Sequence, residues 1–197
     1  DPSLDVSKSE HPKHMKIWYT SRTHTQLAQL VKELRKLKYI PSMAILASRS
    51  QTCINRNVLK NSKDDIDRVC QQLHKDPINQ CPYEKSPKNN TIPPEFLKAS
   101  CTDERYLKFD IEDLKDYCRE ADLCPYLIAK NLAKKADIVF APYNYIIDPS
   151  LREQMSINVK GDIVIIDEAH NIESSCRDAA TLNLRFEEIA NGLQWST

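Results

Sequence analysis

The chain has 197 residues, of which 41% are hydrophobic and 28% charged, with a formal net charge of zero. This length suits one sizeable core. The sequence has no long apolar run and no basic, apolar leader, so we expect neither a membrane span nor a signal peptide. Only two residues are glycine, so the chain holds no glycine-rich loop of the kind that binds phosphate.

Residues 1–15 are polar and contain proline, which predicts a flexible segment. A short buried-type strand is expected over 17–20, followed by an amphipathic helix that ends at 39–41. The next strand covers 43–47, and the order strand, helix, strand favours a parallel sheet. Residues 1 to 60 hold eleven Lys and Arg but only four Asp and Glu, so a local electropositive face is expected.

This regular pattern stops between Ser48 and about Leu123, where six of the seven cysteines lie if Cys124 at the boundary is included. The stretch has few apolar residues and a polar loop over 86–94. Asp110 can cap a short helix. We expect an irregular, mainly helical lobe that something other than apolar burial stabilises.

The α/β pattern resumes at Pro125, which suits the first turn of a helix that ends near Lys135. Strands are expected over 138–141, where Pro142 stops the strand, and over 163–166. The four consecutive apolar residues of the last strand predict a central position in the sheet, covered on both faces. The fold class is therefore α/β, with a parallel sheet.

Two adjacent acids follow the last strand directly, in the sequence Asp167-Glu168-Ala169-His170. Ligands of open α/β sheets lie beyond the carboxyl ends of the strands. There, Asp167 can hold Mg²⁺ and Glu168 can orient or deprotonate an attacking water, as in ATP hydrolysis. The plainer alternative is an acidic pair that only ends a strand before a turn.

Four cysteines have 16, 10 and 42 residues between successive members, namely Cys53, Cys70, Cys81 and Cys124. Ordinary zinc sites use close cysteine pairs, and this set has none. A proline follows both Cys81 and Cys124, a step familiar at iron-sulphur ligands. The alternative is a set of inert buried thiols. We interpret the other three, Cys101, Cys118 and Cys176, as packing or surface thiols.

The segment 21–26 joins a strand to a helix N-terminus, where hydroxyls, backbone N–H groups and an arginine can hold a nucleic-acid phosphate. Arg49, after the next strand, has a similar position, and Tyr143 can stack on a base. The predicted nucleic-acid contacts are Arg22, Thr23, His24, Gln26, Arg49 and Tyr143. The alternative is that Thr23 only caps the helix, Arg22 is solvated and the tyrosine completes a core.

These segments together resemble the iron-sulphur, XPD-like DNA helicases of superfamily two, and most of all the Fanconi anaemia group J and telomere-elongation branches. The resemblance runs from about Lys16 to Leu193. The residues that carry it are 19–26, 47–49 with 53–55, 123–126, 136–145 and 164–173.

The resemblance implies a partial RecA-like motor domain over 16–50 and 125–197, with a [4Fe-4S] lobe inserted at 51–124. The implied cluster ligands are Cys53, Cys70, Cys81 and Cys124. It also implies that Asp167 and Glu168 serve Mg-ATP hydrolysis and that His170 couples the nucleotide site to movement. The activity it implies is 5′ to 3′ translocation on single-stranded or forked DNA, in the nucleus, for genome maintenance.

The phosphate-binding Walker A loop of this family is expected on sequence before Asp1, and its arch and second motor domain after Thr197. We therefore expect this chain alone to be inactive in ATP hydrolysis and unwinding. Residues 55–57 also differ from the His-Pro-Glu that usually follows the first cysteine. The leading alternative is a non-enzymatic, metal-stabilised DNA-binding module. A second alternative is a DEAH-type ATPase whose cysteines hold no metal.

Overall fold

The computed structural model describes residues 15–39, 41–61, 66–76, 78–84, 91–97 and 106–181. Apart from Met15, the segment predicted to be flexible lies outside the described residues. Cys101 and most of the predicted polar loop also lie outside them. No helix in the described part of the chain is long and apolar enough to cross a membrane.

The sheet has four parallel strands in the order β2-β3-β1-β4. The strands are β1 (Ile17–Ser21), β2 (Met43–Ile45), β3 (Ile138–Pro142) and β4 (Ile163–Ile166). Tyr19 of β1 lies opposite Phe140 of β3 on one side and Ile165 of β4 on the other. The predicted α/β class and parallel sheet are thus confirmed.

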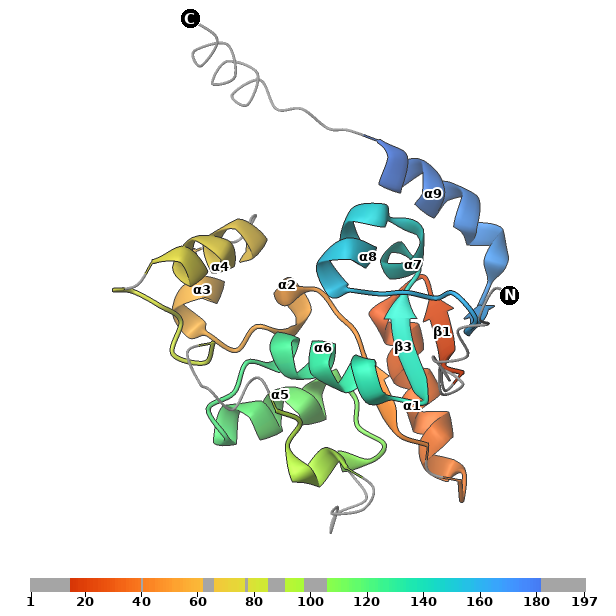
Figure 1. The fold of residues 1–197 in the computed structure, drawn as a ribbon, viewed down its shortest axis with the longest axis horizontal. Coiled ribbons are helices and arrows are strands. Elements are labelled where there is room, and N and C mark those ends of the chain that lie inside the picture. The colour runs from red at the N-terminus through yellow and green to blue at the C-terminus, as the bar shows by residue number, and fades with distance from the viewer. Residues whose placement is uncertain are drawn as a thin grey trace, which may run out of the picture.

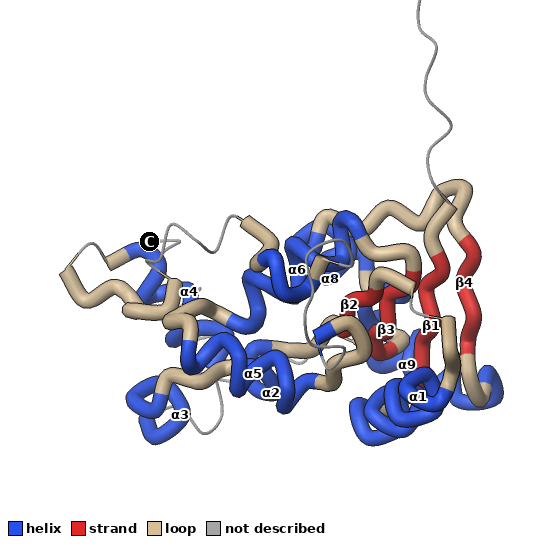
Figure 2. Tube along the Cα trace, turned by 90° about the horizontal axis from the view of Figure 1, so that it is seen from below, coloured by secondary structure: helices blue, strands red, loops and turns tan. Residues whose placement is uncertain are grey.

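Helices cover both faces of the sheet, as Figure 2 shows. On one side lie α6 (Pro125–Lys135) and α8 (Pro149–Met155), and on the other lie α1 (His24–Lys36) and α9 (Ile172–Ala180). The short helix α7 (Asn144–Ile147) links β3 to α8. The residues of α1 and α6 that face the sheet supply much of the core.

Helix α1 begins with a capping box, which fixes where the chain turns out of β1. The Thr23 hydroxyl accepts a hydrogen bond from the Gln26 N–H (3.3 Å), and the Gln26 side chain accepts one from the Thr23 N–H (3.1 Å). Leu27 and Val31 are fully buried on the inner face of the helix. The helix ends at Lys36 and leaves Leu37 55% exposed, so the predicted helix was a few residues too long.

Between β2 and α6 the chain forms the predicted helical lobe, which extends away from the sheet in Figure 1. Its described elements are α2 (Arg49–Thr52), α3 (Arg56–Asn61), α4 (Ile66–Lys75), the 3-10 helix η2 (Pro94–Phe96) and α5 (Ile111–Glu120). Asp110 caps α5 as predicted, because its side chain accepts hydrogen bonds from the N–H groups of Glu112 and Asp113.

The two halves of the lobe differ in how much apolar surface they bury. Helix α4 has no buried residue, in keeping with the prediction. For the second half the prediction is wrong, because Phe96 and Phe109 are buried, with their ring centres 4.9 Å apart, and belong to the same core as the sheet. These aromatic residues are widely spaced in the sequence, so they produce no periodic signal.

The prediction of a central, doubly covered strand over 163–166 is also wrong. In the described residues β4 pairs only with β1, at the edge of the sheet, and the side chains of Ile163, Val164 and Ile165 are 36–45% exposed. A continuous apolar run indicates a strand with two apolar faces, but it does not show which other segments cover those faces.

Candidate functional site

The carboxyl ends of the four parallel strands meet at one edge of the sheet, and the predicted polar residues lie in the loops that follow them. Arg22 follows β1, Ser48 follows β2, Tyr143 follows β3 and Asp167 follows β4. This edge is where open α/β sheets bind their ligands. The backbone N–H of Asp167 donates to the carbonyl of Thr20 (2.9 Å), which fixes the end of β4 against β1.

The acid pair occupies a sharp turn between β4 and the 3-10 helix η4 (Ala169–Asn171). Glu168 has φ 48° and ψ 51°, a left-handed conformation that few residues other than glycine adopt. Such strain often lies at functional sites, where the surrounding structure maintains it. The pKa of Tyr19 is raised, mainly by burial and in smaller part by the negative charge of Asp167.

Two hydrogen bonds join this turn to the loop after β1. The Gln26 amide donates to the Glu168 carboxylate (3.0 Å), and the Arg22 guanidinium donates to the side-chain oxygen of Asn171 (3.2 Å). The His170 ring lies 3.0 Å from the Asn171 amide nitrogen. The predicted catalytic and nucleic-acid segments are therefore in direct contact, and Asn171 is a member of this network that the sequence analysis missed.

A pocket of about 240 Å³ lies beside this network, and three predicted nucleic-acid residues line it together: Arg22, His24 and Tyr143. The Tyr143 side chain is buried. Its hydroxyl and the Nδ1 atom of His24 have no hydrogen-bond partner among the described residues. Burial also lowers the pKa of His24 and so favours the neutral ring. The pocket therefore offers the Arg22 guanidinium to a ligand, whereas the Tyr143 hydroxyl and the His24 Nδ1 atom are buried. A Tyr143 ring that is only 3% exposed does not fit the predicted stacking on a base.

The other predicted contacts have roles within the protein. Thr23 caps α1, and Gln26 hydrogen-bonds with Thr23 and Glu168. Arg49 is turned toward the lobe, where it pairs with Asp67 at 3.0 Å and covers the ring of Tyr126. The structure therefore groups Arg22, His24 and Tyr143, and leaves Arg49 outside that pocket.

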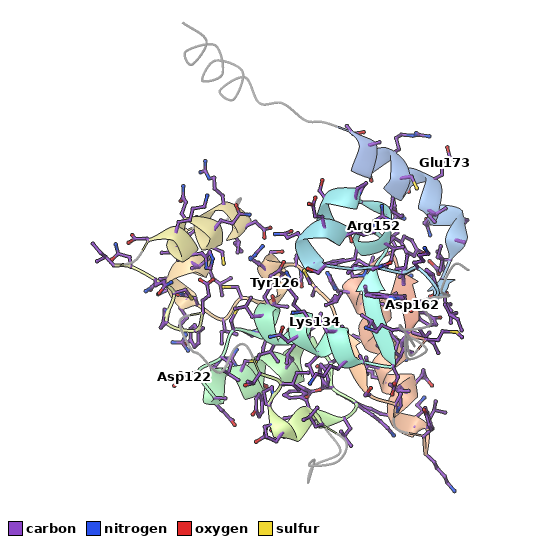
Figure 3. The ribbon with its side chains drawn as sticks, in the orientation of Figure 1. Asp122, Tyr126, Lys134, Arg152, Asp162 and Glu173 are labelled. Atoms are coloured by element: carbon purple, nitrogen blue, oxygen red, sulfur yellow. The ribbon has the colours of Figure 1, made fainter. Side chains whose placement is uncertain are left out.

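The four predicted cluster ligands line a single cavity of about 50 Å³: Cys53, Cys70, Cys81 and Cys124. They come from four separate places in the lobe, namely the end of α2, the middle of α4, the loop after α4, and the N-cap of α6. The cavity lies between the lobe and the first turn of α6. Tyr126, another of its lining residues, is labelled in Figure 3.

The free thiols of this cavity are difficult to ionise. Burial raises the pKa of Cys53 and Cys70, and that of Cys124 to about 12, so the free thiols stay protonated. In the described part of the chain, no three His, Cys, Asp or Glu side chains are placed to hold a single metal ion. The four cysteines therefore line one cavity in the described residues without forming a site for a single metal ion.

Asn55 is a contact of the cavity that the sequence analysis did not assign. Its side-chain amide donates to the sulfur of Cys81 at 3.4 Å, and such hydrogen bonds tune metal-bound sulfurs. The signal was the departure from the usual residues after the first cysteine, but nothing in the sequence showed which sulfur Asn55 would contact.

The described cysteines outside this cavity agree with their interpretation as packing and surface thiols. Cys118 is fully buried in the core, and burial raises its pKa to about 12. Cys176 is exposed on α9.

A parallel α/β sheet with an acid pair at its carboxyl edge and a cysteine-bearing helical lobe is the arrangement expected of a fragment of an XPD-like helicase. Residues 19–189 match the model of the DEAD_2 family, and the chain belongs to that family. The predicted resemblance is thus confirmed.

Two relatives illustrate the match. The chain is 37% identical over 180 residues to the regulator of telomere elongation helicase 1 of Mus musculus, covering 91% of this chain and 14% of the relative. It is 40% identical over 177 residues to the Fanconi anemia group J protein homolog of Gallus gallus, covering 88% of this chain and 14% of the relative. The chain thus spans about one seventh of the length of these proteins.

The fold is similar to a solved structure titled XPD helicase. The superposition has a TM-score of 0.55 at 20% sequence identity, and it covers 81% of this chain and 25% of the solved one. At this identity the likeness supports the fold alone.

Proposed function

We propose that the chain is the segment of an ATP-dependent DNA helicase that carries the acid pair, a DNA-contacting loop and a [4Fe-4S] lobe. The full-length protein would translocate 5′ to 3′ on single-stranded or forked DNA, in the nucleus, for genome maintenance. The observation that best supports this is the hydrogen bond between Gln26 and Glu168, because it joins the predicted DNA-binding segment to the predicted hydrolytic carboxylate.

In ATP hydrolysis Asp167 would hold Mg²⁺, and Glu168 would orient the attacking water. The phosphate-binding loop would come from elsewhere in the full-length protein, because the two glycines of this chain lie too far apart to form one. The proposed coupling role of His170 is supported by two contacts: its ring lies beside the Asn171 amide, and the side-chain oxygen of Asn171 accepts a hydrogen bond from Arg22.

In DNA binding Arg22 would contact a backbone phosphate, with the His24 and Tyr143 side chains in the same pocket. Such contacts carry no base preference, as expected of a protein that translocates along any sequence.

In the lobe Cys53, Cys70, Cys81 and Cys124 would hold a [4Fe-4S] cluster. When bound, the cluster would supply covalent links between four segments of chain. Helix α4 has most need of these links, because it has no buried residue of its own.

The test is ATP hydrolysis by the full-length protein, with and without single-stranded DNA. Asp167→Asn and Glu168→Gln should each lower the DNA-stimulated kcat by about 100-fold or more. Glu173→Gln is the matched control, because Glu173 is exposed on α9 and pairs only with Arg177 in the described residues. A full-length protein that binds DNA but hydrolyses no ATP would instead support a non-enzymatic, metal-stabilised DNA-binding module.

A further inference from the structure

The side-chain amide of Gln26 is held in one orientation by its neighbours. Its oxygen accepts hydrogen bonds from the Ser21 hydroxyl (2.6 Å), the Thr23 hydroxyl (3.1 Å) and the Thr23 backbone N–H (3.1 Å). A backbone N–H can only donate, so it identifies this atom of the amide as the oxygen. The amide nitrogen must therefore face the other way.

On that other side the amide nitrogen of Gln26 lies 3.0 Å from a carboxylate oxygen of Glu168. A carboxylate only accepts hydrogen bonds, so the geometry of both partners agrees. Hydrogen bonds to charged groups are stronger than those between neutral groups. Glu168 needs such support, because its backbone is left-handed and its side chain is exposed.

We propose that Gln26 is a positioning residue: its hydrogen bond holds the Glu168 carboxylate in the position from which it orients the attacking water. This proposal rests on the proposed function of Glu168. It replaces the predicted DNA contact of Gln26, since Gln26 does not line the pocket that contains Arg22, His24 and Tyr143.

The placement also gives a route from DNA to hydrolysis. Arg22 lies in the short connection between β1 and α1, and Gln26 lies in the first turn of α1. Gln26 contacts Glu168, and Arg22 contacts Asn171 in the 3-10 helix that follows the acid pair. A phosphate that binds Arg22 would shift the neighbouring residues Ser21 and Thr23, which orient the Gln26 amide through their hydrogen bonds. Bound DNA would thus favour one position of Glu168.

The test uses Gln26→Met in the full-length protein, because methionine keeps the length of the side chain and removes the amide. The DNA-stimulated kcat should fall about 10- to 100-fold, while the KM for ATP and the Kd for single-stranded DNA stay within about twofold. Gln29→Met is the matched control, because Gln29 is exposed on the same helix and hydrogen-bonds with Glu33 instead. It should leave all three constants unchanged.

Two further variants separate the alternatives. Asp110→Ala removes the capping box of α5, and it should lower Tm without changing kcat. If Gln26→Met behaves like Asp110→Ala, Gln26 has only a capping role and the proposal is wrong. A weaker Kd for DNA with an unchanged kcat would also overturn it. Hydrolysis that survives Glu168→Gln would instead show that the proposed role of Glu168 has failed.

Discussion

The guanidinium of Arg49 lies 4.0 Å from the centre of the Tyr126 ring. Arg49 precedes the first cysteine of the cavity and Tyr126 follows the last, so this contact closes the lobe at its base. Arg49 also pairs with Asp67 of α4 at 3.0 Å, and its side chain is only 17% exposed. One side chain therefore joins the entry to the lobe, its exit and the helix that carries Cys70.

Arg49→Ala should loosen this closure and weaken retention of the proposed cluster. A partly desolvated cation–π contact contributes about 1–2 kcal/mol, and the ion pair with Asp67 adds to it. The measurement is the rate at which a chelator bleaches the visible absorbance of the cluster. We expect bleaching about tenfold faster than in the parent chain, and no change for Arg56→Ala, whose side chain is exposed on α3. Equal rates for Arg49→Ala and the parent would show that the contact does not support the cluster.

Cys124→Ser should unfold only the part of the lobe that depends on the cluster. Without one ligand, α3 and α4 lose their attachment, whereas α5 and α6 share the core of the sheet and should remain folded. Hydrogen exchange should therefore rise over residues 53–84 and stay slow over 111–142. Cys176→Ser is the control. A uniform rise in hydrogen exchange across both segments would show that the folding of α5 and α6 also depends on Cys124.

Arg22→Ala should weaken the binding of single-stranded DNA of any sequence. One lost phosphate contact should reduce the slope of log K against log salt by about 0.7, the value for a single strand. Arg119→Ala provides the comparison, because Arg119 is exposed on α5 and pairs with Asp116. An unchanged slope for Arg22→Ala would mean that Arg22 serves only its hydrogen bond with Asn171.

The cysteines outside the cavity should differ widely in their reactivity. Cys176 is exposed, whereas Cys118 is fully buried and its pKa is raised to about 12. Because the thiolate is the reactive form, iodoacetamide at pH 8 should label Cys176 first and Cys118 only after unfolding. Peptide mass spectrometry over time measures this order. Early labelling of Cys118 in the folded chain would contradict its buried position.

The sequence predicted the fold where local signals are strong. The strand before Ser21, the helix capped by Thr23 and the helix capped by Asp110 all begin where the sequence places them. The edge position of β4 was not predictable, because it depends on pairing between segments. The buried Phe96 and Phe109 were missed for the same reason, since their partners are distant in the sequence.

For the candidate site, the sequence indicated which residues take part but not which role each residue has. Spacing and motif placed Arg22, Gln26 and Arg49 in one predicted role. The structure separates them, because Arg22 lines the pocket beside Tyr143, Gln26 contacts Glu168, and Arg49 contacts Tyr126. Side-chain direction after a strand depends on neighbouring loops, and no pattern within one segment contains that information.

Metal analysis of the chain purified without oxygen tests whether the four cysteines of the lobe cavity bind one iron-sulphur cluster. We expect about four iron and about four acid-labile sulphide per chain, both lost in Cys124→Ser. One zinc per chain, or no metal, would contradict it.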